Sequence, residues 1–116
     1  DIVTGLYVIK AWDWSLGIFQ KVKGKYDFAS AQEGIFEVEA CGGAFLGISK
    51  GVIKHPQMAY EPFEFIREGN IVHGEDVSFC QRAREAGFKI FCDSSIRVGH
   101  MKTEVIKVGD KQPDIY

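Results

Sequence analysis

Two adjacent carboxylates and a later histidine are the residues of this sequence whose types could support chemistry. Glu75 and Asp76 stand at the start of a segment with helical periodicity, and His100 closes the segment that follows. Carboxylates and imidazoles exchange protons and bind metal ions. Acids in the first turn of a helix also oppose its macrodipole, worth about 0.3–1 kcal/mol each. A histidine after a strand is by default a surface or packing residue, so a structural and a chemical interpretation both stand.

The elements around these residues predict where they lie. Apolar residues recur every three to four positions after Asp76, which predicts an amphipathic helix over 76–86 that ends at Gly87. The strand predicted over 88–92 covers about the same length as this helix, roughly 16 Å. Its far end therefore returns to the level of the helix start. These lengths allow His100 to lie near the start of the helix, but they do not determine its position.

The rest of the chain reads as strands joined by turns and loops. Gly42-Gly43 interrupts one strand region, where another backbone or a ligand can come close. Residues 18–30 are expected to form a short hairpin or an extended excursion. The other expected elements are a strand over 2–10, the interrupted strands over 35–49, a helical turn over 49–53, a loop over 54–70 with a helical turn at 63–67, a turn at 93–95 and a strand over 96–100.

Composition excludes several classes of protein. The 116 residues are 46% hydrophobic and 26% charged, which suits one domain or part of one. A net charge of −2 gives no basic surface for nucleic acid, and no apolar run reaches the ~20 residues of a membrane span. Three cysteines without a C-x-x-C pair indicate a reducing compartment, so we expect a cytoplasmic protein or one peripheral to a membrane. Cys80 and Cys92 are expected to face each other in the core.

Three stretches resemble a known family. "GEDVSFCQRAREAGFKIFCDSSIRVGH" is similar to the C-terminal signature of GT-A glycosyltransferases of the family-2-like group. "DIVTGLY" and "ACGGAFLGISKGVI" resemble earlier segments of that family in the same order. The resemblance implies a partial GT-A fold, an α/β mixed sheet with few helices and without the N-terminal nucleotide-binding half. Residues 1–106 would be the acceptor and catalytic-base part, followed by a polar tail over 107–116.

The resemblance also implies residue roles. Asp76 matches the carboxylate that deprotonates the acceptor hydroxyl in inverting members, with Glu75 as its neighbour. His100 matches the histidine that helps to hold Mn²⁺ or Mg²⁺ on the nucleotide diphosphate. The implied partners are a nucleotide-diphosphate sugar and a glycan or other hydroxyl acceptor. The expected substrate-binding residues are Gly42, Gly43 and Ala44, and also Trp12 and Trp14, which flank an acid and could stack on a sugar ring.

The sequence departs from the family in one respect that keeps other functions open. No D-x-D metal motif and no Gly-rich phosphate loop occur, so this chain alone is expected to transfer nothing. A chain that opens inside a strand also suggests a fragment, whose open sheet edge would self-associate. One alternative is a non-catalytic glycan-binding or assembly module with the same fold. Another is a small metal-binding protein that uses His73, Cys80, Cys92 and His100.

Overall fold

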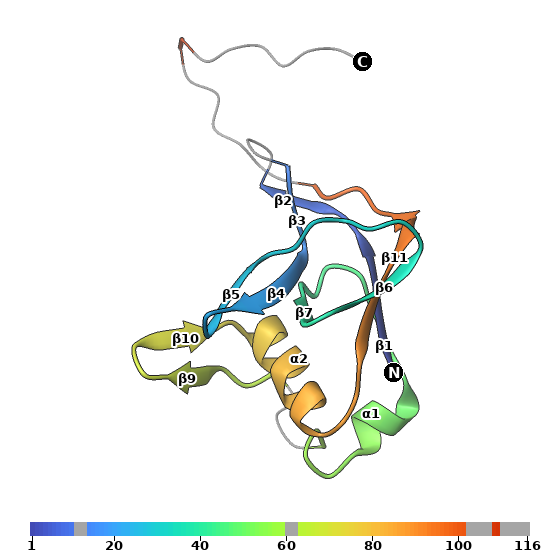
Figure 1. The fold of residues 1–116 in the computed structure, drawn as a ribbon, viewed down its shortest axis with the longest axis vertical. Coiled ribbons are helices and arrows are strands. Elements are labelled where there is room, and N and C mark those ends of the chain that lie inside the picture. Colours follow the sequence, from blue (N-terminus) through green and yellow to red (C-terminus); the bar gives the residue numbers. More distant parts are fainter. Residues whose placement is uncertain (11–13, 60–62, 102–107, 110–116) are drawn as a thin grey trace.

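A four-stranded mixed sheet organises the chain, with strand order β6–β11–β1–β8 (Figure 1). The computed structural model describes residues 1–10, 14–59, 63–101 and 108–109. β1 and β11 run parallel, and β6 and β8 pair antiparallel at the two sides. The bounds are β1 Ile2–Leu6, β6 Ile35–Val38, β8 Leu46–Ile48 and β11 Ile90–Arg97. The expected mixed sheet with few helices is confirmed at this level of detail.

Three smaller sheets and two helices complete the described chain. Lys23 and Gly24 link β4 and β5 with φ of 51° and 79°, as a two-residue type I′ turn requires, so the predicted hairpin is confirmed. The elements are β2 Val8–Lys10 with β3 Ser15–Leu16, β4 Ile18–Val22 with β5 Lys25–Phe28 and β7 Ala40–Cys41, β9 Ile66–Glu68 with β10 Ile71–His73, and the helices α1 Lys50–Lys54 and α2 Glu75–Glu85.

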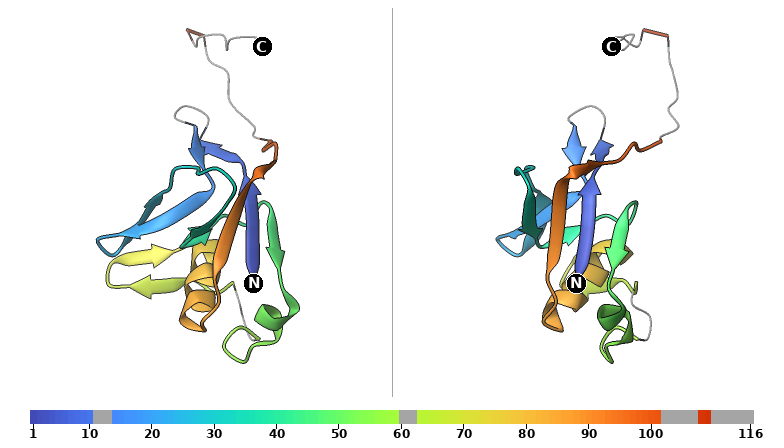
Figure 2. Two further views of the ribbon diagram at one scale, coloured as in Figure 1. Left: turned by 45° about the vertical axis from the view of Figure 1, so that its right-hand side comes forward. Right: turned by 90° about the vertical axis from the view of Figure 1, so that its right-hand side faces the viewer.

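Helix α2 lies behind the main sheet, beside the β9–β10 hairpin (Figure 2). Its end follows the Schellman pattern: Gly87 has φ of 96°, its N–H donates to Arg84, and the N–H of Phe88 donates to Ala83. This agrees with the helix end expected at Gly87. The buried side chains of the core include Ile2, Ile18, Val38, Phe79, Cys80, Ala83 and Ile90.

Two local expectations are wrong. The helical turn expected at 63–67 overlaps strand β9, which pairs with β10 just beyond the expected loop, because Gly69 with φ of 60° and Asn70 make a tight hairpin turn. Residues 93–95, expected to form a turn, belong to strand β11, where the N–H of Ser94 donates to the carbonyl of Gly34. The register with β1 shifts between Cys92 and Arg97, so this part of β11 forms a bulge.

Within the polar tail expected over 107–116, residues 107 and 110–116 lie outside the described residues. None of the helices in the described part of the chain has both the length and the apolar character needed to span a bilayer.

Candidate functional site

Tyr7, which sequence analysis did not single out, lies at the centre of the candidate site. It occupies the one-residue step between β1 and β2 and is only 4% exposed. Its hydroxyl accepts a hydrogen bond from the backbone of Ala44. Burial raises the pKa of this hydroxyl above its usual value, although the Ala44 hydrogen bond lowers it. Tyr7 therefore holds a neutral, tightly surrounded phenol against the segment that follows β7.

Two glycines make room for this phenol. A Cβ on Gly42 would lie 2.0 Å from the Tyr7 hydroxyl, and a Cβ on Gly17 would lie 2.5 Å from Tyr7 Cζ. The same residues are joined through their backbones, because Gly42 N–H donates to Gly17 (2.9 Å) and Gly17 N–H donates to Tyr7 (3.0 Å). No larger residue fits at either position while the ring stays in place. Gly42 thus makes room for a side chain, whereas the sequence predicted the close approach of another backbone or a ligand at the Gly42-Gly43 pair.

Asp76 faces the same glycine segment from the first turn of α2. Its Oδ1 accepts the N–H of Val77 at 2.8 Å. Its Oδ2 lies 3.6 Å from the position of a Cβ on Gly42, and its own Cβ lies 3.8 Å from that of Gly43. Gly74 precedes the helix without a side-chain cap, so Asp76 stands at the positive end of an otherwise uncapped helix. Among the described residues, only Oδ1 has a hydrogen-bond donor, so Oδ2, on the side of Gly42, is the open carboxylate oxygen.

His100 reaches the group from beyond the end of β11. Its ring packs edge-on against Tyr7, with centroids 5.5 Å apart. Its Nδ1 lies 2.8 Å from the carbonyl oxygen of Val8, so the tautomer with Nδ1–H donates there and keeps the Nε2 lone pair. We call Tyr7, Gly17, Gly42–Ala44, Asp76 and His100 the Tyr7 site. It gathers Asp76, Gly42, Gly43, Ala44 and His100 of the expected site residues around one phenol.

The remaining expected residues contribute less to this arrangement. Glu75 is exposed beside Asp76 on the first turn of α2. Trp14 is 64% exposed and has φ of 56° just before β3. Trp12 lies outside the described residues. The stacking role expected for the two tryptophans stays a prediction.

The described residues do not form a complete metal centre. A carbonyl-bound Nδ1 is the usual second contact of a metal-binding histidine, so His100 is suited to supply one ligand. Across the described ranges, however, no three His, Cys, Asp or Glu side chains gather as a metal site requires. The four residues of the metal-protein interpretation lie apart. His73 packs on Tyr26, and Cys80 contacts Cys41, whereas sequence analysis paired it with Cys92.

A polar network occupies another face of α2. Arg84 donates to the Tyr26 hydroxyl at 3.1 Å and forms an ion pair with Glu39 at 2.9 Å. The Tyr26 hydroxyl donates to Gln81 at 2.8 Å, and Gln81 donates to Glu68. Burial raises the pKa of Tyr26, and the neighbouring Arg84 lowers it. The network ties α2 to the β4–β5 and β9–β10 hairpins and holds the helix that carries Asp76.

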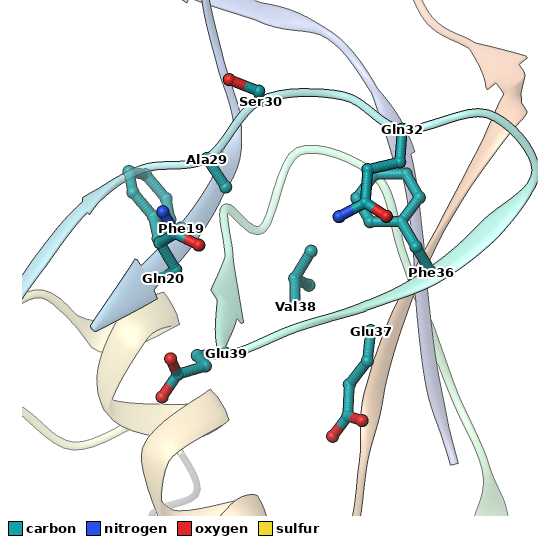
Figure 3. Close-up of a pocket in the computed structure, with 9 residues that line it drawn as sticks. All are labelled: Phe19, Gln20, Ala29, Ser30, Gln32, Phe36, Glu37, Val38 and Glu39. Atoms are coloured by element: carbon teal, nitrogen blue, oxygen red, sulfur yellow. The ribbon is translucent and has the colours of Figure 1, made fainter. Parts of the chain in front are cut away.

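Two cavities differ in their relation to the site. One cavity has a volume of about 250 Å³ and shares no residue with the Tyr7 site. Figure 3 shows its lining residues, which come mainly from β4, β6 and the segment that follows β5. A second cavity, of about 240 Å³, adjoins Tyr7. Apolar side chains from β1, β2 and β3 line it, and Arg97 and Val98 complete it. The second cavity is the concave surface next to the site.

Comparison of this chain with family models, with curated proteins and with solved structures found no match.

Proposed function

We propose that this chain is the acceptor and catalytic-base part of a GT-A-type glycosyltransferase. The complete enzyme would move a sugar from a nucleotide-diphosphate donor to a hydroxyl acceptor, with inversion. One observation carries the proposal: segments around residues 7, 42–44, 76 and 100 meet in a single site, although they are far apart in the sequence. The family resemblance names five residues of this group, which are Gly42, Gly43, Ala44, Asp76 and His100, and their common location supports the proposal.

The chemistry assigned to Asp76 follows from its free oxygen. A sugar hydroxyl is a weak nucleophile, and a carboxylate within hydrogen-bond reach assists it by taking its proton. Oδ1 is engaged by the Val77 N–H, so Oδ2 is the atom that accepts the proton. Gly43 and Ala44 are exposed beside it and leave space for an acceptor. Glu75, exposed on the same turn, has no separate step in this scheme.

The proposal includes metal binding only as the contribution of one ligand, from His100. A bound Mn²⁺ or Mg²⁺ would neutralise the charge on the leaving diphosphate. His100 can supply one nitrogen ligand, but the described residues do not complete the coordination, so no step is routed through an ion. We therefore expect donor binding to need residues beyond the described part of the chain.

A second candidate is a non-catalytic glycan-binding or assembly module of the same fold. It is favoured by the sequence, which contains no D-x-D motif in its 116 residues. In this module the Tyr7 site would bind a sugar hydroxyl through Asp76 without transferring anything to it. The two candidates differ in whether Asp76 accepts a proton or only a hydrogen bond.

The matched pair Asp76→Asn and Glu75→Gln tests the assignment. In the longer protein that the proposal requires, a panel of nucleotide-diphosphate sugars with Mn²⁺ is screened for transfer and for donor hydrolysis. Loss of the base is expected to lower kcat by roughly 10²–10⁴-fold for Asp76→Asn, and Glu75→Gln by much less. Equal activity in the two variants would refute the role of Asp76. Glycan binding that depends on Asp76, without turnover of any donor, would favour the second candidate.

A further inference from the structure

Two buried thiols meet directly beneath the Tyr7 site. Cys41 ends β7 and Cys80 lies in the middle of α2, with their sulfur atoms 3.8 Å apart. Both are free thiols, and both are buried, with exposures of 1% and 0%. Cys92, the third cysteine, is equally buried on β11. Cys41 and Cys80 therefore form a close pair, and Cys92 provides an internal reference for the same kind of core environment.

We infer that Cys41 and Cys80 are a site of reversible disulfide formation that fastens β7 to α2. A disulfide needs sulfur atoms about 2.0 Å apart, so the two sulfurs must approach each other by somewhat less than 2 Å. Cys41 lies in a two-residue strand and precedes two glycines, so its backbone is free of the restraints of a long ladder. We expect the backbone at Cys41 to move and so to bring the two sulfur atoms together.

The reaction balances with a peroxide as oxidant. The Cys80 thiol loses its proton, and the thiolate attacks one peroxide oxygen, so that an S–O bond forms, the O–O bond breaks and hydroxide leaves. The hydroxide takes up the proton from the thiol to give water, and Cys80 is left as a sulfenic acid. The Cys41 sulfur then attacks the Cys80 sulfur, the S–S bond forms, and a second water leaves with the remaining proton. The hydrogen bond between the thiols raises the pKa of Cys41 and lowers that of Cys80, which favours Cys80 as the first nucleophile. A dithiol reductant reverses the change.

The disulfide would act on the site through its two neighbours. Cys41 is followed by Gly42, and Cys80 lies one helical turn after Asp76 on the same face of α2. Drawing the sulfurs together moves the Gly42 segment relative to the Asp76 carboxylate. We expect this movement to change the transfer activity. That expectation rests on the proposed function, whereas disulfide formation itself does not.

Thiol counting and peptide mapping test the site without any substrate. The protein is treated with hydrogen peroxide, denatured and titrated for free thiols. We expect the count to fall from three to one, with a loss of 2 Da and a proteolytic peptide linking Cys41 to Cys80. Cys92→Ala should behave like the wild type, with its own thiol removed from the count. Cys41→Ala should retain both remaining thiols and form no intramolecular link.

A second measurement detects the disulfide by its effect on the stability of the fold. The bridge closes a loop of about 40 residues, so the oxidised chain should unfold at a urea midpoint roughly 1–3 M higher than the reduced chain. The reductant should return the midpoint to its starting value. Three free thiols after oxidation, a link that involves Cys92, or a sulfinic acid in place of the link would overturn the inference. If the link forms but the reduced longer protein transfers no sugar from any donor, the proposed function fails and the disulfide site stands.

Discussion

Gly42→Ala is the change that most directly tests how the Tyr7 site is built. The added methyl carbon would stand 2.0 Å from the Tyr7 hydroxyl, a separation that non-bonded atoms do not adopt. The Tyr7 ring also lies close against Gly17, where an added Cβ would come within 2.5 Å of Cζ. The strain must therefore be relieved by moving the ring or by separating β7 from Gly17.

The cost of this change follows from two contributions. Overpacking a filled interior costs about 1–3 kcal/mol. Displacing the hydroxyl also breaks its hydrogen bond with the backbone of Ala44, which is worth about 1 kcal/mol. We therefore expect Gly42→Ala to lower the free energy of unfolding by about 2–4 kcal/mol, a large part of the 5–15 kcal/mol typical of a domain.

Urea denaturation followed by circular dichroism measures this cost, with two further variants as controls. Gly43→Ala is the matched control, because its Cβ would have an ordinary 3.8 Å contact with Asp76. Tyr7→Phe removes the clashing oxygen, after which the nearest ring atom to the new methyl is Cζ at 3.2 Å. The double variant should therefore recover at least about 1 kcal/mol in a double-mutant cycle. Equal stability of Gly42→Ala and Gly43→Ala, or no recovery by Tyr7→Phe, would refute the reasoning.

Two further predictions concern alkaline pH and association. Burial raises the pKa of Tyr7 and of Tyr26 above the usual 10.0, so the unfolded chain loses these protons first. The free energy of unfolding should then fall as the pH rises through 10, less steeply in Tyr7→Phe; parallel curves for the two proteins would contradict this. Light scattering should show concentration-dependent self-association, because β6 and β8 end the main sheet and Ile35 on β6 is 70% exposed. Ile35→Lys should weaken the association, and a clean monomer of the unmodified chain at high concentration would rule it out.

Local patterns predicted the elements that depend on local forces. The spacing of apolar residues and Gly87 located α2 and its end, because periodicity and the left-handed C-terminal turn act within a few residues. The Asp-Ser-Ser run predicted a turn because turn preferences also act within a few residues. It failed there because Gly34, some 60 residues away, bonds Ser94 and holds the run within strand β11, where it forms a bulge.

The candidate site could be predicted only in part, for reasons that concern partners in space. Asp76 and the Gly42 segment were identified by resemblance, and the fold brings them together. Tyr7 was missed because a tyrosine in a strand-like segment has the pattern of an ordinary core residue. Its importance depends on Gly17 and Gly42 facing it from two sides, which no local pattern records. The contact between Cys41 and Cys80 was missed for the same reason.

The enclosure of Tyr7 by two glycines also restricts which residues related sequences can carry at these three positions. Positions 7, 17 and 42 occupy one shared volume, so a substitution at any of them changes which residues the other two accept. Relatives that keep an aromatic ring at position 7 should keep glycine at both other positions. Relatives with a side chain at 17 or 42 should carry a small residue at 7. An alignment of such sequences would therefore show these three columns changing together.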